Sequence, residues 1–297
     1  MHTPAKMVSA ECCPVCGGED FRTAFEEPPY RLLRCERCGT RIVSPRLAEP
    51  ESIYAEESYW RSESPRTLGY NDYRAAEPLY LKTFRRRLAF VLRDQPRRGR
   101  ALDVGCAAGF CMAALRELGF EAHGVEVSET IASHAIERLG FDTVHVGTLD
   151  SAPYEEGTFE LITLWDVIEH VPDPRALLSR ARELLAPGGL LVVETQNIGS
   201  VFARTLGRRW HHYKHAEHIY HFTPGALRQL LEAAGFTMER MTPRHAGKYV
   251  SLDFIAERAG RVHPSLAIAL RPLARLRSVS LYVNVMDELI ATARPAG

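Results

Sequence analysis

From Ala101 onward the sequence alternates between short apolar segments and amphipathic segments, and this alternation restricts the fold more than any other feature. The apolar segments predict strands, which are ALDV, EAHGVEV, DTVHV, FELITLWDV and LLVVETQN. The amphipathic segments predict helices, which are CMAALRELG, ETIASHAIERLG, DPRALLSRARELLAPGG and TPGALRQLLEAAG. Strands that alternate with helices form a mostly parallel sheet with helices on both faces. The sequence therefore predicts an α/β fold.

The end of the chain predicts how this sheet closes. SLYVNVMDELIATARP predicts one or two further strands, so we expect a Rossmann-like, mostly parallel, seven-stranded sheet. Before it, SLAIALRPLARL predicts an extra helix that Pro272 interrupts. Ligands of such sheets bind beyond the carboxyl ends of the strands. The loops expected around one crevice follow Val104, Val127, Val146, Leu164 and Thr195.

Two segments of different composition precede the sheet. Residues 1–45 are rich in cysteine, proline and glycine, whereas residues 46–98 contain the amphipathic pattern LYLKTFRRRLAFVLRDQ. Within it we interpret the run from Arg85 to Arg87 as a solvated helix face. We predict three parts, which are a metal-binding segment (1–45), a helical cap or linker (46–98) and a ligand-binding domain (99–297).

The first part contains two C-x-x-C-G turns, CPVCG and CERCG. Tetrahedral zinc takes four thiolates, and each turn offers two on one side. We predict a zinc ribbon whose structural zinc is held by Cys13, Cys16, Cys35 and Cys38, with Cys12 as a spare neighbour. Four protein ligands leave no open position for catalysis, and the metal would supply the folding energy of so small a segment. A redox dithiol or cysteines without metal are the alternatives.

Composition excludes some classes of partner. Lysine plus arginine number 37 and aspartate plus glutamate number 37, so the charge does not favour nucleic acid or an anionic membrane. The sequence has no apolar run that could cross a bilayer and no apolar core of a secretory signal near its start. We therefore expect a soluble cytoplasmic protein, in which the seven cysteines serve as metal ligands or free thiols rather than in disulfides.

The first strand leads into ALDVGCAAGF, which has the form of a nucleotide-binding loop. Dinucleotide sites use G-x-G-x-x-G, and that register places glycine at only one of its three positions here. An acidic residue followed by G-x-A-x-G describes the loop better, as Asp103, Gly105, Ala107 and Gly109. Small residues let the backbone approach a ligand closely. Glu126 ends the next strand, where a carboxylate accepts hydrogen bonds from two ribose hydroxyls.

Four stretches in this order and spacing resemble the class I S-adenosylmethionine-dependent methyltransferases: LDVGCAAG, GVEVS, GTLDSAPYEEGTFELITLWDVIEHV and LLAPGGLLVVETQN. The resemblance covers the chain from about Glu49 to its end. It departs from the family at Ala107, where glycine is usual, and at Glu160, where aspartate is more usual. With its zinc ribbon and late W-…-EH-…-F segment, the chain is similar to bacterial enzymes that methylate sugars, glycans or natural-product intermediates, and to ubiquinone-pathway O-methyltransferases.

The resemblance implies that S-adenosylmethionine is the cofactor and assigns the loop residues to its parts. Gly105, Ala107 and Gly109 would line the methionine moiety. Asp103 would hold the loop and the amino group, and Glu126 would bind the ribose.

The same resemblance assigns residues of the later strands and of the cap. Leu149 and Asp150 would flank the adenine, with Asp150 facing its exocyclic amine, and Trp165 and Asp166 would wall the cofactor near its sulfonium. His170 occupies a characteristic position whose role is structural. Aromatic residues that would cap the cofactor, with simple packing as an equal alternative, are Tyr59, Tyr70 and Tyr73.

The stretch WHHYKHAEHIYHFTP contains five histidines and follows the fifth strand, so it can fold over the crevice. His218 lies in the pair that resembles the family's late EH motif, and we predict it as general base with a pKa near the working pH. His215 is the second candidate, and Glu217 is a possible orienting partner. The other histidines are expected to pack with aromatic neighbours, and a metal at the three-residue spacing is disfavoured because no carboxylate or cysteine completes the pattern.

These observations predict S-adenosylmethionine-dependent methyl transfer to a small-molecule, sugar or natural-product acceptor, at oxygen. One alternative is an RNA methyltransferase that uses the zinc ribbon for recognition, which the neutral charge disfavours. The other is a catalytically silent module that binds its cofactor and zinc only for structure.

Overall fold

The computed structural model describes residues 6–62, 69–94, 98–256, 265 and 279–297. Its centre is a seven-stranded sheet of order β12-β15-β10-β9-β6-β7-β8. β15 runs antiparallel to both its neighbours, whereas the pairs from β10 to β8 are parallel. The strands of this sheet are β6 (Arg100–Val104), β7 (Glu121–Glu126), β8 (Val144–Val146), β9 (Phe159–Trp165), β10 (Leu185–Gln196), β12 (Phe236–Thr242) and β15 (Glu288–Pro295). The predicted Rossmann-like, mostly parallel sheet is confirmed.

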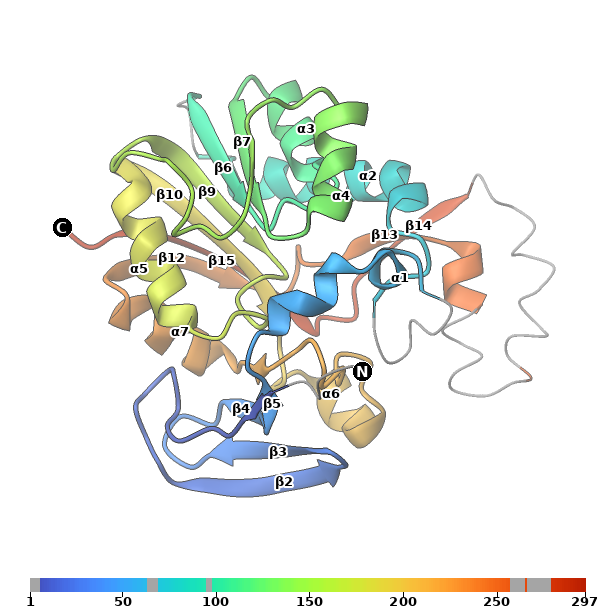
Figure 1. The fold of residues 1–297 in the computed structure, drawn as a ribbon, viewed down its shortest axis with the longest axis vertical. Coiled ribbons are helices and arrows are strands. Elements are labelled where there is room, and N and C mark those ends of the chain that lie inside the picture. Colours follow the sequence, from blue (N-terminus) through green and yellow to red (C-terminus); the bar gives the residue numbers. More distant parts are fainter. Residues whose placement is uncertain (1–5, 63–68, 95–97, 257–264, 266–278) are drawn as a thin grey trace.

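Helices cover both faces of this sheet (Figure 1). On one side lie α2 (Glu77–Val91), α3 (Phe110–Glu117) and α4 (Glu129–Ser133), which continues as a π-helical turn (His134–Arg138). On the other side lie α5 (Pro174–Leu184) and α7 (Pro224–Ala233). Alternate residues of a strand point to opposite faces, so Leu190 and Val192 of β10 enter one apolar core and Leu191 and Val193 enter the other.

Local signals explain where the helices on the second face begin. The Asp173 side chain caps α5 by accepting hydrogen bonds from the amides of residues 175 and 176 at 3.0 and 2.9 Å. Thr223 caps α7 in the same way, and Pro224 follows it at the first helical position. The Pro-Gly-Gly run, however, does not end α5. The helix ends at Leu184, and the run forms the irregular start of β10, before the pairing with β9 shifts register.

Short helices of the predicted cap lie over the carboxyl ends of the strands. They are η1 (Pro50–Ala55), α1 (Glu57–Trp60) and η2 (Arg74–Ala76). The Trp60 indole donates to the Ser128 hydroxyl at 3.2 Å, just beyond the end of β7. The Tyr73 ring stacks on Phe110, the first residue of α3, with a centroid distance of 5.6 Å. The longer α2 packs against α3 and so belongs to the helix layer of the main sheet.

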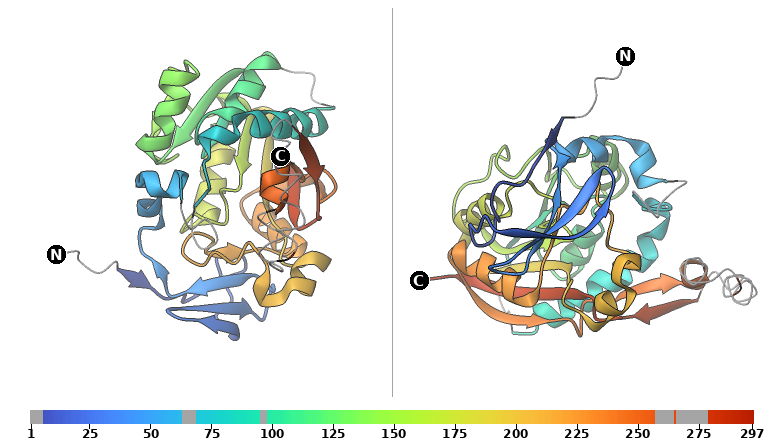
Figure 2. Two further views of the ribbon diagram at one scale, coloured as in Figure 1. Left: turned by 90° about the vertical axis from the view of Figure 1, so that its right-hand side faces the viewer. Right: turned by 90° about the horizontal axis from the view of Figure 1, so that it is seen from below.

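The N-terminal cysteine segment forms a second sheet of order β11-β4-β3-β2. Its strands are β2 (Phe21–Glu27), β3 (Tyr30–Cys35), β4 (Arg41–Ser44) and β11 (Tyr220–His221), while β1 (Met7–Val8) pairs with β5 (Arg46–Leu47). β11 comes from the late histidine segment, so one edge of this sheet is contributed by a distant part of the chain. The left view of Figure 2 shows this sheet at the lower end of the molecule.

Of the predicted closing strands, one joins the main sheet as β15 and the other, β14 (Ser280–Val283), pairs with β13 (Lys248–Ser251). The loop after β10 contains α6 (Val201–Leu206) and η4 (Gly207–Arg209). The helix predicted for SLAIALRPLARL lies outside the described residues, apart from Ser265. No helix in the described part of the chain has the length and apolar character needed to span a bilayer.

Candidate functional site

The loop after β6 makes a tight turn that only small residues allow. Gly105, Ala107 and Gly109 have φ angles of +71°, +45° and +81°. A Cβ atom at Gly105 would lie 2.7 Å from a methyl group of Val167, and one at Gly109 would lie 2.7 Å from the Cβ of Ala135. Ala107 itself adopts a left-handed conformation, which costs a residue with a Cβ about 1–2 kcal/mol. Ala107 therefore occupies a position that favours glycine.

Glu126 joins the two loops that follow β6 and β7. Its carboxylate accepts one hydrogen bond from the Ala107 amide and one from the Ser128 amide, both at 2.9 Å. The residue is only 5% exposed, and burial raises the pKa of its carboxyl group while the two amide donors lower it. The side chain predicted to bind the ribose is thus fixed at the carboxyl edge of the sheet, next to the glycine-rich turn.

Asp103 is the second-last residue of β6, just before this turn, and it is also buried. Its carboxylate accepts a hydrogen bond from the Thr163 hydroxyl on β9 at 2.6 Å. Burial raises its pKa to about 7, although the Thr163 hydroxyl opposes the shift. A cation placed beside Asp103, such as the ammonium group of an amino acid moiety, would favour the charged form.

The residues predicted to flank the adenine follow β8. The Gly147 amide donates to the backbone carbonyl of Glu126 at 2.9 Å, so this loop begins beside the predicted ribose ligand. Leu149 is 4% exposed, whereas Asp150 is exposed. An apolar wall and a free carboxylate therefore lie on the same side of the sheet as Glu126.

Trp165 ends β9 beside the turn, and Asp166 follows it. The Trp165 indole donates to the Cys111 sulfur at 3.1 Å, and its ring lies 5.6 Å from the guanidinium carbon of Arg87. Asp166 has a φ of +53° and is half-buried. Burial raises the pKa of Asp166 to about 6, and repulsion from Glu288 adds to the shift.

A buried ionic cluster lies beyond Asp166, and it is not among the features predicted from the sequence. Arg87 on α2 is 4% exposed, contacts Glu194, and lies 3.3 Å from Oε2 of Glu288. The other oxygen of Glu288, Oε1, accepts from Lys248 at 3.1 Å. The interpretation of the arginine run as a solvated face is correct for its first two members but wrong for Arg87. The sequence signal that could have revealed this cluster is Glu194, a charged residue inside the apolar strand LLVVETQN.

The cap and the late histidine segment meet at Glu217. Its carboxylate accepts from the Tyr59 hydroxyl and from the Gly69 amide, the latter at 3.3 Å, and it pairs with Lys214 at 2.9 Å. Glu217 is 1% exposed. Tyr59 thus holds the segment to the cap, while Tyr73 packs on α3 beside the glycine-rich turn.

His218 lies on the same segment but does not bond to the Glu217 carboxylate. Its Nδ1 donates to the backbone carbonyl of His212 at 2.7 Å, which leaves Nε2 as a hydrogen-bond acceptor. Burial, followed by the neighbouring His170, holds the pKa of His218 well below its usual range rather than near neutrality. His170 lies beside it with a ring-centroid distance of 4.7 Å and donates from Nδ1 to the backbone carbonyl of Glu217 at 2.8 Å.

The remaining histidines of the segment point in different directions. His215 lies between Phe25 and Tyr30 of the cysteine-bearing sheet, with ring centroids 5.7 and 5.9 Å away. The Nε2 atoms of His211 and His212 lie 3.7 and 3.6 Å from an Asp287 oxygen. His221 contacts the side-chain oxygen of Gln196 through Nδ1 at 2.6 Å. The histidines at every third position therefore do not converge on a common site.

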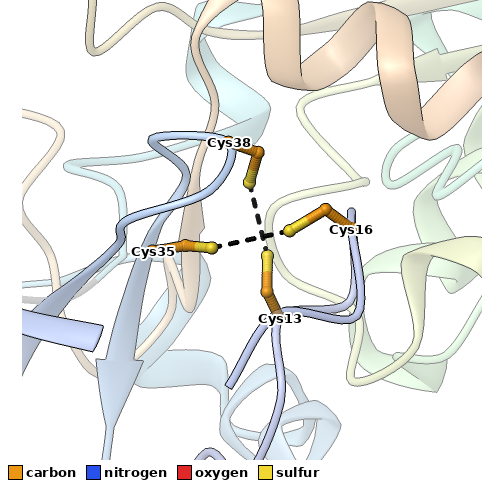
Figure 3. Close-up of side chains that lie close together, drawn as sticks. All are labelled: Cys13, Cys16, Cys35 and Cys38. Carbon is orange, nitrogen blue, oxygen red and sulfur yellow. Dashed lines mark hydrogen bonds between the residues drawn. The ribbon is translucent and has the colours of Figure 1, made fainter. Parts of the chain in front are cut away.

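The four predicted cysteine ligands do converge (Figure 3). Their sulfur atoms lie within 4.8 Å of one another, with Cys13 to Cys38 and Cys16 to Cys35 each at 3.5 Å. A disulfide needs about 2.05 Å. A zinc with bonds of about 2.3 Å in a tetrahedron needs about 3.8 Å between sulfurs, which is close to the observed spacing. Both turns have the same form, because a glycine with positive φ follows the second cysteine of each. The arrangement fits a closed zinc site.

The chain is similar to known proteins in sequence. Residues 73–240 match the family described as "Methyltransferase domain". The chain is 30% identical over 170 residues to the ubiquinone biosynthesis O-methyltransferase of Xanthomonas axonopodis pv. citri, covering 52% of this chain and 69% of that protein. It is also 30% identical over 176 residues to the protein of that name from Psychrobacter arcticus, covering 53% of this chain and 66% of the relative.

Solved structures share the fold at lower identity. One is a chain in the complex between the Haloferax volcanii Trm112 methyltransferase activator and its methyltransferase partner, with a TM-score of 0.53 and 13% identity, covering 84% of this chain and 98% of that one. Another is a Pyrococcus horikoshii OT3 protein with a TM-score of 0.50 and 17% identity, covering 81% of this chain and 99% of that one.

Proposed function

The chain belongs to the class I S-adenosylmethionine-dependent methyltransferases, and from that premise we propose that it methylates an oxygen atom of a hydroxyl-bearing small molecule, such as a sugar or a natural-product intermediate. When bound, S-adenosylmethionine supplies a methyl group already activated on a sulfonium. The protein has to bind the cofactor, align the acceptor and exclude water. Such positioning contributes about 7–11 kcal/mol in favourable cases.

The observation that carries the cofactor site is the Glu126 carboxylate, which is fixed by two backbone amides at the end of β7. In the proposed site it accepts from the ribose hydroxyls, and the turn from Gly105 to Gly109 passes close to the methionine moiety. Asp103 holds the amino group. The Leu149–Asp150 pair flanks the adenine, because its loop begins beside Glu126.

The contact between Tyr59 and Glu217 supports a small acceptor. This contact joins the cap to the histidine segment, and both elements are buried there. An acceptor beneath them has to be small enough to enter, whereas a folded RNA would require the contact to open. The same enclosure excludes water from the reacting atoms.

The charges near Asp166 support a polar acceptor. Glu288, Lys248 and Arg87 are the charged groups that act most strongly on Asp166, and Lys214 follows them. Asp166 and Lys248 are only partly buried, so covering them with a long apolar chain costs free energy, because the hydrogen bonds of their exposed atoms to water are not replaced. Hydroxyl groups of a sugar or a polyhydroxylated intermediate replace those bonds. The oxygen preference also agrees with the names of the two relatives, which are both O-methyltransferases.

We assign the removal of the acceptor proton to His218. Its Nδ1 proton is held by a backbone carbonyl, so Nε2 carries the lone pair, and its low pKa keeps the ring neutral at pH 7. His215 is less suitable, because it lies among aromatic rings of the cysteine-bearing sheet. Glu217 positions the segment through Tyr59 rather than orienting the His218 ring. The four cysteines hold a structural zinc that takes no part in the reaction.

The proposal is tested by following a labelled methyl group. The protein is incubated with methyl-labelled S-adenosylmethionine and, separately, with a low-molecular-weight metabolite fraction and with total RNA. We expect label in the metabolite fraction, in a product stable to mild alkali as an ether is. Label confined to RNA would favour the ribbon as a nucleic-acid reader, and cofactor binding without transfer to any fraction would indicate a silent module.

A further inference from the structure

We propose that the four-cysteine centre and strand β4 position the histidine segment (residues 210–222) for methyl transfer. This inference rests on the proposed function for its catalytic consequence, but its structural part can be measured independently. In this view the zinc ribbon is neither a reader of the substrate nor a separate module. It is a support for one wall of the active site.

The backbone connects the two elements directly. In the register of the sheet, Tyr220 is paired with Ile42 and His221 with Arg41. The Val43 amide donates to the carbonyl of Ile219 at 2.9 Å. The histidine segment therefore contributes an edge strand to the sheet that carries the second pair of cysteine ligands.

Side chains extend this contact on both sides of the strand pair. Cys13, Cys35 and Ile42 share one apolar core with Ile219 and Tyr220. At the other end of β4, the Arg41 guanidinium donates to the hydroxyl of Tyr213 at 2.6 Å, and His215 lies between aromatic rings of β2 and β3. The cysteine centre and the histidine segment are thus packed as one unit.

The opposite side of the segment contacts the cap and the carboxyl edge of the main sheet. Glu217 bonds to Tyr59 of the cap, and His218 lies next to His170, which follows β9. The amides of Ile219 and Tyr220 donate to the carbonyl of Glu169 at 3.0 and 3.2 Å. The segment is therefore held between the cysteine-bearing sheet and the carboxyl edge of the main sheet.

Loss of the metal should weaken the contact between the histidine segment and the cysteine-bearing sheet. A small segment held by four thiolates loses most of its folding energy without zinc. Glu126 is held by the amides of Ala107 and Ser128, which both lie outside the ribbon, so the proposed cofactor site should keep its geometry. A displacement of about 1 Å in a positioned group can cost about 10²-fold in rate. Zinc loss should consequently lower kcat while leaving cofactor affinity nearly unchanged.

Two variants of the full chain separate the metal from the contact. Cys35→Ser removes a zinc ligand. Val43→Pro keeps every cysteine but removes the amide that donates to Ile219, on the side of β4 that faces β11. Val43→Ala is the matched control, because it shortens the side chain and keeps the amide. For each protein we measure zinc content, amide hydrogen exchange of peptides from residues 210–222, S-adenosylmethionine affinity by calorimetry, and kcat on the identified acceptor.

We expect Cys35→Ser to lose zinc and Val43→Pro to retain about one equivalent. In both variants, the rate of amide hydrogen exchange in residues 210–222 should rise about tenfold or more, while peptides from β6 and β9 should keep their protection from exchange. Cofactor affinity should change less than about threefold, and kcat should fall by about 10²-fold. Val43→Ala should resemble the parent protein in exchange and turnover.

Two results would overturn the inference. One is a Val43→Pro protein whose segment stays protected and whose kcat is unchanged. The other is a zinc-free Cys35→Ser protein with the same properties. If Cys35→Ser does not fold, Val43→Pro decides alone. If the parent protein transfers no methyl group, the proposed function fails, while zinc content and hydrogen exchange still decide whether the ribbon holds the segment.

Discussion

Replacing Glu126 with alanine tests the cofactor site at the residue on which it depends most. The carboxylate holds the loops after β6 and β7 through the amides of Ala107 and Ser128, and it is assigned to the two ribose hydroxyls. Alanine removes all four of these interactions. Two consequences follow, and they are measured separately because one concerns the free protein and the other concerns binding.

The magnitudes come from the burial and the charge of the group. In the free protein, two buried amides lose their acceptor, which costs about 1–3 kcal/mol of unfolding free energy for each. In the complex, two hydroxyls lose a charged acceptor, which we place at about 2–4 kcal/mol of binding free energy. That range corresponds to an increase in Kd of about 30- to 900-fold.

Isothermal titration calorimetry with S-adenosylmethionine measures the affinity, and chemical denaturation of the free protein measures the stability. Glu129→Ala is the matched control, because Glu129 is an exposed carboxylate three residues further along the same loop and helix. It should leave both quantities within about 0.5 kcal/mol of the parent. Unchanged affinity in a folded Glu126→Ala protein would refute the assignment of Glu126 to the ribose.

Three further predictions concern the surrounding residues. Arg87→Met leaves two buried carboxylates without their guanidinium, so urea denaturation should show a loss of about 3–5 kcal/mol, and a loss below about 1 kcal/mol would contradict a buried ion pair. Burial raises the pKa of Asp103 to about 7, so the folded, cofactor-free protein favours the protonated carboxyl group. The stability that this preference contributes is complete below the usual pKa of aspartate and is lost as the pH rises through about 7. Asp103→Asn should therefore gain thermal stability relative to the parent between pH 5 and pH 8, and parallel melting curves across that range would show that Asp103 does not titrate there. His218→Ala should keep cofactor affinity and lose about 10²-fold in kcat. A loss below threefold would mean that the histidine segment covers the site but does not supply the base.

The sequence predicts features whose physical causes are local. The left-handed turn needs small residues at fixed spacing, so Gly105 and Gly109 are recognisable in the sequence alone. The cysteine turns are equally local, and the structure brings their sulfurs together. Apolar strands alternating with amphipathic helices likewise specify a parallel sheet, because each element has to bury its own apolar face.

What the sequence does not predict depends on partners far along the chain. Arg87 is buried because Glu194 and Glu288 meet it in the fold, and no helical pattern on α2 reveals them. The carboxylate of Glu217 bonds to Tyr59 across a sequence separation of 158 residues, so its role as a link to the cap was not apparent. The low pKa of His218 also follows from tertiary burial, whereas an exposed histidine would titrate near its usual value.

The pairing of β11 with β4 is the clearest example of a contact that sequence reasoning missed. The three-part division of the chain remains a prediction, yet the cysteine-bearing sheet includes residues Tyr220 and His221 from the last part. Two-residue strands have no periodic signal of their own, so this pairing could be found only in three dimensions. It also gives the four-cysteine centre a place beside the proposed active site of a methyltransferase.

A crystal structure of the protein with S-adenosylhomocysteine tests the central claim most directly. We expect the ribose hydroxyls against Glu126, the amino acid moiety along the turn from Gly105 to Gly109, and the sulfur facing Trp165 and Asp166. The adenine should lie beside the Leu149–Asp150 loop. Ligand density at another place, or none at a concentration that saturates related methyltransferases, would contradict the account.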